Sequence, residues 1–468
     1  MGKIISSCTT ILAGKKATID GSTLIARTED HSDQAEPQTF VVVEPQDQPQ
    51  HYQAKLSKFS LDLPKTPLRY TATPDVNHEK HGIWAGAGIN SDKVAMTATE
   101  TITTNSRILA LDPLVKDGFG EEDMPTIVLP YIHSAREGVI RMGSLLTEYG
   151  TYESNGMAFS DKDEVWYLET YGGHHWAALR IPDEAYVVAP NRLNIDYFDF
   201  ASEDTLCSAD LENFINDNYL NPDEKNYNFR HIFGSSTVKD TRYNNPRAWY
   251  IQSFFTPSVI QDPQDHDLPF ICQADRKLTI EDVKWALSSH YQNTVFDRYG
   301  EGELADKKLF RPVGINRNEE SHILQIRNDI ADAVAGIHWL GFGPNTFNAF
   351  VPFYVNITDT PTAFRDTSAE YDPDKAYWLA RTLGVLGDTN YSVYSELEAD
   401  FEQAVMAQCR AVIHQTDAKI SSVTDIDQLL TQANQEMADI YMKESKRLLG
   451  KMVVNGSAQM KLKFSIFD

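Results

Sequence analysis

Short runs of hydrophobic and hydroxyl residues, bounded by turn residues, predict that the first third of the chain is rich in β-strands. The first run covers residues 9–13, and the second covers residues 22–27, directly after the turn dipeptide Asp20-Gly21. Two adjacent strands joined by a short polar connection pair as a hairpin. We therefore expect an antiparallel hairpin that begins at Cys8.

The middle of the chain predicts one helix followed by several closely spaced strands. Apolar positions recur with near-helical spacing over residues 124–149, and Gly150 follows as a stop. Strand patterns then come in close succession, at residues 156–160, 165–169, 175–181 and 186–189, with further ones at 316–326 and 337–354. Because short turns join antiparallel strands, these runs predict antiparallel sheet.

The last hundred residues are mainly helical in pattern. One apolar stripe runs through residues 397–412, and another through residues 426–441 before Gly450, which we expect to end that helix. Residues 460–466 alternate like an edge strand. Antiparallel strands with helices segregated from them predict an α+β fold of stacked layers, with the helices of residues 366–468 packed on the same domain.

Composition and charge exclude several classes of protein for this chain. The chain has 468 residues, 41% of them hydrophobic, and a formal net charge of -25. Nucleic acid and anionic membranes are excluded as partners, because both need clustered Lys and Arg. No apolar stretch is long enough to span a bilayer. The four cysteines are far apart and share no metal-type spacing, which favours a reducing, cytoplasmic location.

Cys8 is the strongest candidate for chemistry. Small residues precede it, and cleavage of the Ser7-Cys8 bond gives Cys8 a free α-amine beside its thiol. An α-amine has a usual pKa of about 7.7–8.0, which suits a general base near neutral pH. The alternative is an ordinary buried thiol. Residues 1–6 also fit a bare myristoylation pattern. The contrasting class of protein is a lipid-anchored binding protein without enzymatic activity, in which Cys8 is the acylated residue.

Arg27 and Asp30 lie at the end of the second predicted strand, where a hairpin returns beside Cys8. If Cys8 is the nucleophile, we expect Arg27 to lower the pKa of the Cys8 thiol and to hold a carbonyl or carboxylate of the substrate. Asp30 orients the α-amine. The alternative to these functional roles is that Arg27 and Asp30 form an ordinary solvated ion pair at the surface.

The adjacent histidines His174 and His175 raise the question of a metal. Neighbouring residues of a strand point to opposite faces, and the sequence holds no H-E-x-x-H motif. We therefore expect neither a catalytic metal nor a cofactor.

Glu169 is a candidate for binding the α-amine of a substrate. The alternative is that its carboxylate lies at a strand end and is only solvated.

Several ordered motifs carry a family resemblance. They are Cys8-Thr9-Thr10-Ile11-Leu12, Asp20 to Asp30, Ala87-Gly88-Ile89-Asn90, Glu169 to Trp176, Val188-Ala189-Pro190-Asn191-Arg192, Tyr243-Asn244-Asn245-Pro246-Arg247 and Arg311-Pro312-Val313-Gly314. Together they resemble the dipeptidase A family of cysteine-type N-terminal-nucleophile hydrolases, with bile-salt hydrolases and penicillin V acylases as relatives. Several motifs in one order are much harder to match by chance than any one of them.

The resemblance implies a role for each matching residue. Cys8 matches the nucleophile and base, Arg27 the arginine beside the thiolate, and Asp30 the aspartate that holds the α-amine. Asn191 resembles the oxyanion-hole asparagine. Asn90 and Arg247 resemble further polar groups of the acylase relatives.

The resemblance also implies a fold, a reaction and an organisation of the chain. The implied fold is the four-layer αββα sandwich of antiparallel sheets, with additional C-terminal helices. Residues 1–7 are expected to be a propeptide removed by Cys8 itself, residues 8–365 the catalytic domain, and residues 366–468 the helical part. The expected activity is a bacterial dipeptidase of broad specificity on small peptides, without cofactor, in a homo-oligomer. An N-acyl amide hydrolase is the alternative within the fold.

Overall fold

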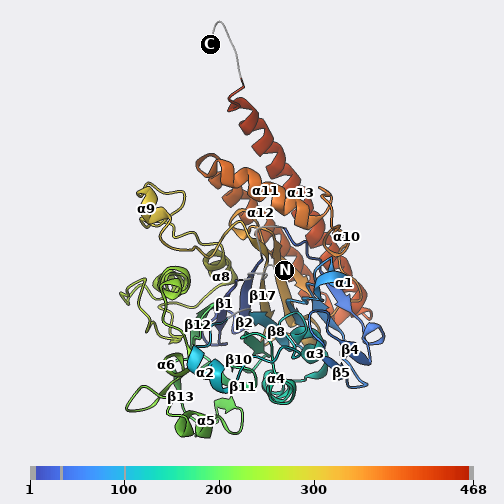
Figure 1. Cartoon of the computed structure of the whole chain (residues 1–468). Helices are drawn as coiled ribbons and strands as arrows, with labels where there is room; N and C mark the ends of the chain where they lie inside the picture. The colour runs from blue at the N-terminus through green and yellow to red at the C-terminus, as the bar shows by residue number, and fades with distance from the viewer. Residues whose placement is uncertain (1–6, 32–34, 100–101, 463–468) are drawn as a thin grey trace.

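A computed structural model describes residues 7–31, 35–99 and 102–462 of the chain (Figure 1). The predicted propeptide residues 1–6 and the end of the predicted edge strand 460–466 lie outside these ranges. Two large antiparallel sheets make up the centre of the molecule, and helices lie at its periphery. The mixed helix and antiparallel-sheet content predicted from the sequence is thereby confirmed.

The larger sheet has seven strands and carries the predicted hairpin at its middle. Its spatial order is β16-β12-β1-β2-β17-β18-β19, and every neighbouring pair is antiparallel. The strands are β1 (Thr9–Ala13), β2 (Thr23–Asp30), β12 (Tyr186–Pro190), β16 (Ile271–Cys272), β17 (Asn318–Ile326), β18 (Gly336–Phe342) and β19 (Val351–Tyr354). The start of β1 therefore lies between the ends of two partner strands.

The second sheet has six strands in the order β14-β11-β10-β9-β8-β7, again antiparallel throughout. Its strands are β7 (Ala87–Ile89), β8 (Ala95–Thr99), β9 (Gly156–Ser160), β10 (Val165–Tyr171), β11 (His175–Arg180) and β14 (Thr205–Cys207). Three two-stranded ribbons complete the strands: β3 (Val41–Val43) with β6 (Tyr70–Ala72), β4 (His51–Gln53) with β5 (Ser60–Asp62), and β13 (Tyr197–Phe198) with β15 (Tyr227–Asn228).

The two large sheets pack face to face, and β1 and β2 are buried on both faces. Successive side chains of a strand point to opposite faces. Leu12 and Ile25 therefore enter the apolar core between the sheets, while Ile11 and Ala26 enter the core on the other face of the seven-stranded sheet. Cys8 shares the alternation of Leu12, so the pleat directs its side chain toward the space between the sheets.

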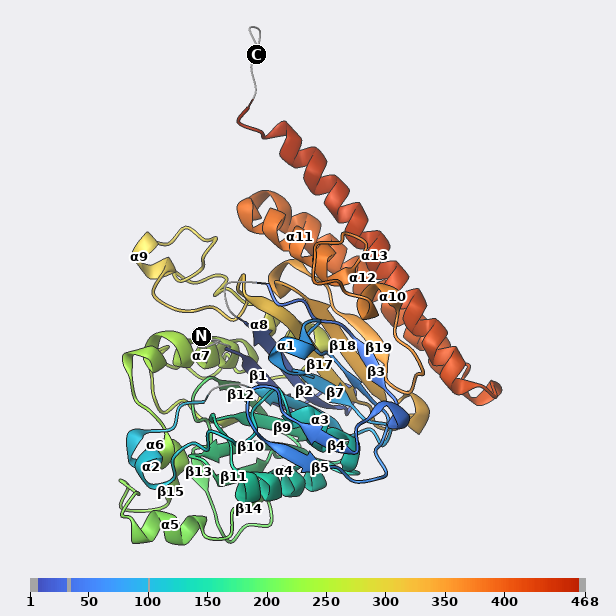
Figure 2. The same cartoon turned by 45° about the vertical axis from the view of Figure 1, so that its right-hand side comes forward.

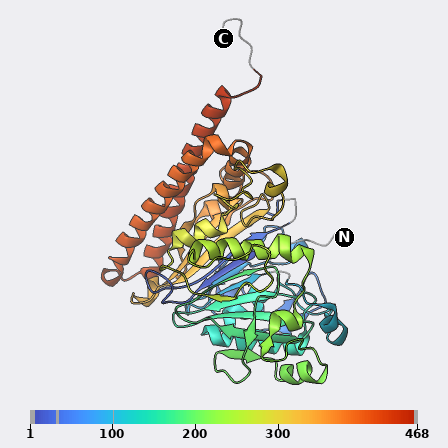
Figure 3. The same ribbon diagram turned by 90° about the vertical axis from the view of Figure 1, so that its left-hand side faces the viewer.

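Helices cover the outer face of each sheet (Figure 2). The short α3 (Met124–Val128) and α4 (Ala135–Tyr149) pack on the six-stranded sheet. The seven-stranded sheet is covered by α7 (Asn245–Phe255), α8 (Ile280–Leu287) and α11 (Ala376–Thr389), and by α12 (Tyr391–Asp417) and α13 (Ile426–Ala458), which lie side by side (Figure 3). Shorter helices lie in the connections: α1 (His78–His81), α2 (Ser106–Leu111), α5 (Leu211–Asp217), α6 (Phe229–Phe233), α9 (Leu304–Lys307) and α10 (Thr362–Arg365).

Two helix predictions were wrong in detail. The predicted helix over residues 124–149 is broken, because Pro130 lies in a 3-10 turn and Ile132 is extended before the cap at Ser134 starts α4. Gly450 does not end its helix, since α13 continues to Ala458. A single glycine costs a helix only about 1 kcal/mol, which the burial of Leu448 and Met452 against the neighbouring helices offsets. In the ranges that the structure covers, no helix is both long and apolar enough to cross a bilayer.

The buried Glu398 of α12 gives the helical part a pH dependence. Burial raises the pKa of Glu398 from its usual 4.5 to about 8, although Lys284 lowers it. Between these two values the folded chain binds a proton that the unfolded chain has lost, so stability falls as the pH rises through this window. We expect thermal unfolding to shift to lower temperature from pH 6 to pH 9, with Glu398 contributing on the order of 1–3 kcal/mol. Glu398→Gln should flatten this decrease, whereas the exposed Glu396→Gln on the same helix should not.

Candidate active site

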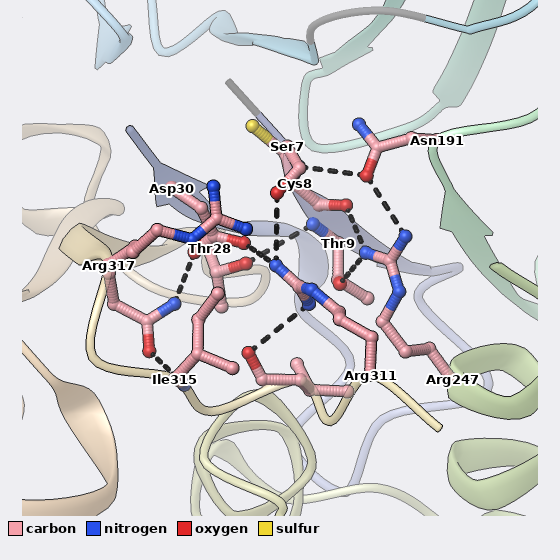
Figure 4. A network of polar contacts seen from close by, with 12 residues as sticks. Ser7, Cys8, Thr9, Thr28, Asp30, Asn191, Arg247, Arg311, Ile315 and Arg317 are labelled. Atoms are coloured by element: carbon pink, nitrogen blue, oxygen red, sulfur yellow. Dashed lines mark hydrogen bonds and ion pairs between the residues drawn. The ribbon is translucent and has the colours of Figure 1, made fainter. Parts of the chain in front are cut away.

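The candidate site lies where β1 begins. Thr9 pairs with Thr28 of β2 and with Pro190 of β12. The Ser7 amide donates to the Asp30 carbonyl at 2.8 Å, so the antiparallel ladder continues beyond the first residue of β1. The predicted cleavage site between Ser7 and Cys8 is thus held directly before β1, next to the ends of β2 and β12 (Figure 4).

The Cys8 thiol is fully buried beside the Arg27 guanidinium. Arg27 Nη1 donates to Cys8 Sγ at 3.3 Å. Burial raises the pKa of the Cys8 thiol to about 12; Arg27 lowers it, while the charges of Glu121, Asp30 and Glu29 raise it further. In this state, with the amide bond to Ser7 intact, the thiol is protonated at neutral pH and needs a base before it can attack.

Buried carboxylates fix the position of Arg27. Its guanidinium donates to Glu29 Oε2 at 2.6 Å, to Glu121 Oε1 at 3.1 Å and to Thr97 Oγ1 at 2.9 Å. Burial alone raises the pKa of Glu29, but Arg27 and His31 lower it to about 2, so this carboxylate is ionised. Arg27 is therefore a charged, rigidly held neighbour of the thiol, and its predicted position is the observed one.

Asp30 is also buried, on the face of β2 opposite to Arg27. Its carboxylate accepts hydrogen bonds from Arg311 and from Asn318, which come from a distant part of the chain. Arg311 Nη2 also donates to Ser7 Oγ at 3.2 Å. Asp30 and Arg311 therefore hold the chain directly before Cys8.

Asn191 and Arg247 complete the surroundings of Cys8. Asn191 follows β12 and comes beside Cys8 because Thr9 pairs with Pro190. Asn191 Oδ1 accepts from the Cys8 amide at 3.1 Å and from Arg247 Nη2 at 3.0 Å. Two donors on one oxygen fix the amide orientation, and the Asn191 nitrogen points away from Arg247 (Figure 4).

Arg247 of α7 binds the main chain of Cys8 directly. Its Nη1 donates to the Cys8 carbonyl at 2.7 Å and to Thr9 Oγ1 at 2.8 Å, and its Nε donates to the Tyr243 carbonyl at 2.7 Å. Burial and the neighbouring Arg311 lower the pKa of Arg247 to about 9, so the guanidinium remains charged at neutral pH. Arg247 thus ties α7 to the first residues of β1.

The structure places Asn90 and Glu169 in other hydrogen-bond networks. The Asn90 amide nitrogen donates to the carbonyls of Leu129 and Ile132, and its oxygen accepts from the amides of Asp92 and Val94. All four hydrogen-bonding positions of this side chain are occupied, so it holds a turn.

Glu169 is buried on β10 and accepts from the amides of Asn194 and Ile195 and from the Tyr171 hydroxyl. Burial raises the pKa of Glu169 to about 7, although the two amide donors lower it. Its contacts fix the loop that carries Asn191. The direct neighbours of Cys8 are instead Arg27, Asn191 and Arg247.

Several residues of the site were missed in the sequence. Glu121 holds Arg27, while Arg311 and Asn318 hold Asp30. Arg311 belongs to one of the motifs that carry the family resemblance, but the resemblance gives it no role. No local pattern gives these partners, because each is far along the chain from the residue that it binds.

One cluster in the described part of the chain has the donor set of a metal site. Glu29, His31 and Asp75 bring three potential ligand atoms within 4.8 Å of one another. Burial lowers the pKa of His31, but the hydrogen bond to Glu29 and the charge of Asp75 raise it to about 10. His31 Nε2 contacts Glu29 Oε1 at 3.1 Å, while His31 Nδ1 and Asp75 Oδ1 have no hydrogen-bond partner among the described residues.

The paired histidines also differ from prediction. His174 Nδ1 and His175 Nδ1 both contact the Asp112 carboxylate, at 2.9 Å and 2.8 Å. They were predicted to point to opposite faces. His174, however, lies in the turn before β11, where the alternation of a strand does not apply.

Comparisons with known proteins identify similar chains. The model of peptidase family C69 matches residues 7–404. The chain is 57% identical to probable dipeptidase B of Lactococcus lactis subsp. lactis (strain IL1403) over 99% of this chain and 98% of that protein, and 56% identical to dipeptidase A of Lactobacillus helveticus over 99% of each. Among solved structures, the chain is similar to a variant of conjugated bile acid hydrolase from Clostridium perfringens. The identity is 10% and the TM-score 0.30, over 74% of this chain and 92% of that chain.

Proposed function

The chain belongs to peptidase family C69, and from this premise we propose that it is a dipeptidase with the Cys8 thiol as its nucleophile. The observation that carries the proposal is the convergence of Arg27, Asn191 and Arg247 on Cys8. We assign the two packed sheets with helices on their outer faces to the four-layer sandwich of N-terminal-nucleophile hydrolases.

The first step of the proposal is removal of the leader. Cys8 Sγ attacks the Ser7 carbonyl carbon and a C–S bond forms. The C–N bond to Cys8 breaks, and the thiol proton passes to the departing nitrogen, which becomes the free α-amine. Water then hydrolyses the resulting thioester and leaves a carboxylate on Ser7. The extended Ser7-Cys8 segment, held by the Asp30 carbonyl and by Arg311, supports this step because it presents one peptide bond in a fixed position.

The second step is hydrolysis of a substrate. The free α-amine of Cys8 accepts the thiol proton, and the thiolate attacks the scissile carbonyl. Arg27 stabilises the thiolate, and the Asn191 amide nitrogen donates to the oxyanion. The protonated amine then gives its proton to the leaving amine, and water hydrolyses the thioester with the α-amine again as base. Dipeptides of varied side chains are the proposed substrates.

Mass spectrometry combined with a peptide panel tests the proposal. We expect purified protein to lack residues 1–7, to begin with cysteine, and to hydrolyse dipeptides faster than glycine-conjugated bile salt or penicillin V. Alkylation of the thiol should stop the reaction. A soluble protein that keeps its leader and cleaves no dipeptide contradicts the proposal, and activity on the conjugates alone identifies an N-acyl amide hydrolase instead.

A further inference from the structure

A strongly basic pocket lies between the turn before α7 and the segment before β17. Its volume is about 470 Å³, within the range of small-molecule sites. Six of its lining residues are cationic: Lys239, Arg242, Arg298, Lys308, Arg311 and Arg317. None of the described residues that line it is acidic. We call these six residues and their cavity the cationic pocket.

The cationic pocket is separate from the candidate active site. None of Cys8, Arg27, Asn191 and Arg247 lines the cavity. Arg311 connects the two regions, because it lines the cavity and also holds the chain directly before Cys8. We therefore treat the cavity as a site of its own, whatever the position of a peptide substrate.

Most cations of the cationic pocket lack an acidic partner. The whole protein has 67 acidic and 42 basic residues, so carboxylates outnumber the basic side chains that they can pair with. Arg311 pairs with Asp30, but the other five cationic side chains form no ion pair with a described acidic residue. Positive charge that no described carboxylate compensates is therefore concentrated around one cavity of a strongly acidic chain.

Two groups beside the cationic pocket show the effect of this charge. Burial raises the pKa of Tyr243, but Arg311 and Arg247 lower it to about 8. Burial lowers the pKa of Arg247, and Arg311 lowers it further, to about 9. Both groups shift in the direction that an excess of positive charge produces. An anion bound among these cations would reduce their mutual repulsion.

The lining of the cavity defines the class of anion. Four of the six cations are arginines, whose planar guanidinium groups donate paired hydrogen bonds to phosphate or carboxylate oxygens. A single carboxylate has one charge and two oxygens, so it leaves most of the six cations unpaired. An anion with several charges pairs with more of them. The cavity is concave and of limited volume, which favours a small molecule over a macromolecule.

We propose that the cationic pocket binds a small molecule with at least two negative charges, as phosphate compounds and polycarboxylates have. The inference goes beyond the proposed dipeptidase function and does not depend on it, because no step of it involves the Cys8 thiol. A ligand that binds only the folded chain also stabilises that chain against unfolding.

Calorimetric titration of the purified protein tests the inference, with pyrophosphate, citrate and acetate as probes at one fixed ionic strength. We expect pyrophosphate or citrate to bind one per chain, at least about tenfold more tightly than acetate, because additional charges pair with additional cations. The better of the two probes distinguishes a phosphate compound from a polycarboxylate. Arg298→Glu/Lys308→Glu, the pocket variant, should lower the affinity for that probe at least about tenfold.

Arg298 and Lys308 are exposed, and neither side chain has a hydrogen bond to a described residue, so the pocket variant should keep its fold. Lys162→Glu/Lys277→Glu is the matched control, because it makes the same change in net charge at exposed positions outside the cationic pocket. The control should bind the probe like the wild type. Arg298→Gln/Lys308→Gln adds no negative charge and should weaken binding by a smaller factor than the pocket variant.

Thermal unfolding gives an independent measurement on the same samples. We expect the better probe to raise the unfolding temperature of the wild type and of the control, but not that of the pocket variant. The inference is overturned if neither pyrophosphate nor citrate shows saturable binding. It is also overturned if the pocket variant binds like the wild type, or if the control weakens binding as much as the pocket variant does. Each of these results leaves the dipeptidase function standing, since dipeptide hydrolysis is measured separately.

Discussion

Cys8→Ala is expected to keep residues 1–7 and to lose dipeptide hydrolysis by a factor of at least about 10⁴, because removal of a nucleophile leaves only the binding contributions to catalysis. The fold should survive, since the Cys8 amide still donates to Asn191 and its carbonyl still accepts from Arg247. Intact mass, initial rates on a dipeptide and thermal unfolding measure the three expectations on the same sample.

Cys207→Ala is the matched control for that prediction. Cys207 is a partly buried thiol on β14, outside the neighbours of Cys8, and burial raises its pKa to about 11. We expect this variant to lose its leader and to hydrolyse dipeptides like the wild type. A Cys8→Ala protein that still loses its leader would show that another protease cuts the chain, and one that still hydrolyses dipeptides would remove Cys8 from the mechanism.

Asn191→Asp should lower kcat on dipeptides by about 10²–10³, the usual effect of losing one oxyanion donor. Aspartate keeps an oxygen that accepts from Arg247 and from the nitrogen of Cys8, so the geometry around β1 is preserved. It replaces the amide nitrogen with a second oxygen, which cannot donate and which repels the developing charge. The loss should therefore appear in kcat, with KM changed little.

Asn191→Ala separates the lost donor from the added charge. Alanine removes the donor without adding a carboxylate, but it also leaves the Arg247 guanidinium without one acceptor. We expect it to be slower than wild type and less stable than Asn191→Asp in thermal unfolding. If both variants hydrolyse dipeptides at the wild-type rate, Asn191 is not the oxyanion donor.

The hairpin and the strands around it could be predicted because their information is local. The predicted runs 9–13 and 156–160 are the observed strands β1 and β9, since short runs between nearby turn residues define both. The two wrong helix predictions arose because they, too, were based on local sequence alone. A proline broke the helix before α4, and Gly450 was not a stop because the packing of α13 outweighs its low propensity.

The candidate site could be predicted only in part. Cys8 and Arg27 are on adjacent strands, so a hairpin was enough to bring them together, and the family resemblance added Asn191 and Arg247. Arg311 is 281 residues from Asp30 and meets it only when β2 and the segment before β17 come together in the fold. Buried charge pairs of this kind depend on tertiary packing, which no single window of sequence contains.

The pairing of Ser7 with Asp30 has a consequence for when activity first arises in the cell. The bond to be cut is in position only after β1, β2 and β12 have assembled and Arg247 has docked from α7. Under the proposed mechanism, a chain that fails to assemble this sheet never exposes its amine, so misfolded copies stay inert. Cleavage of the leader is irreversible and would then occur only in correctly folded molecules. Only these molecules would become able to hydrolyse peptides.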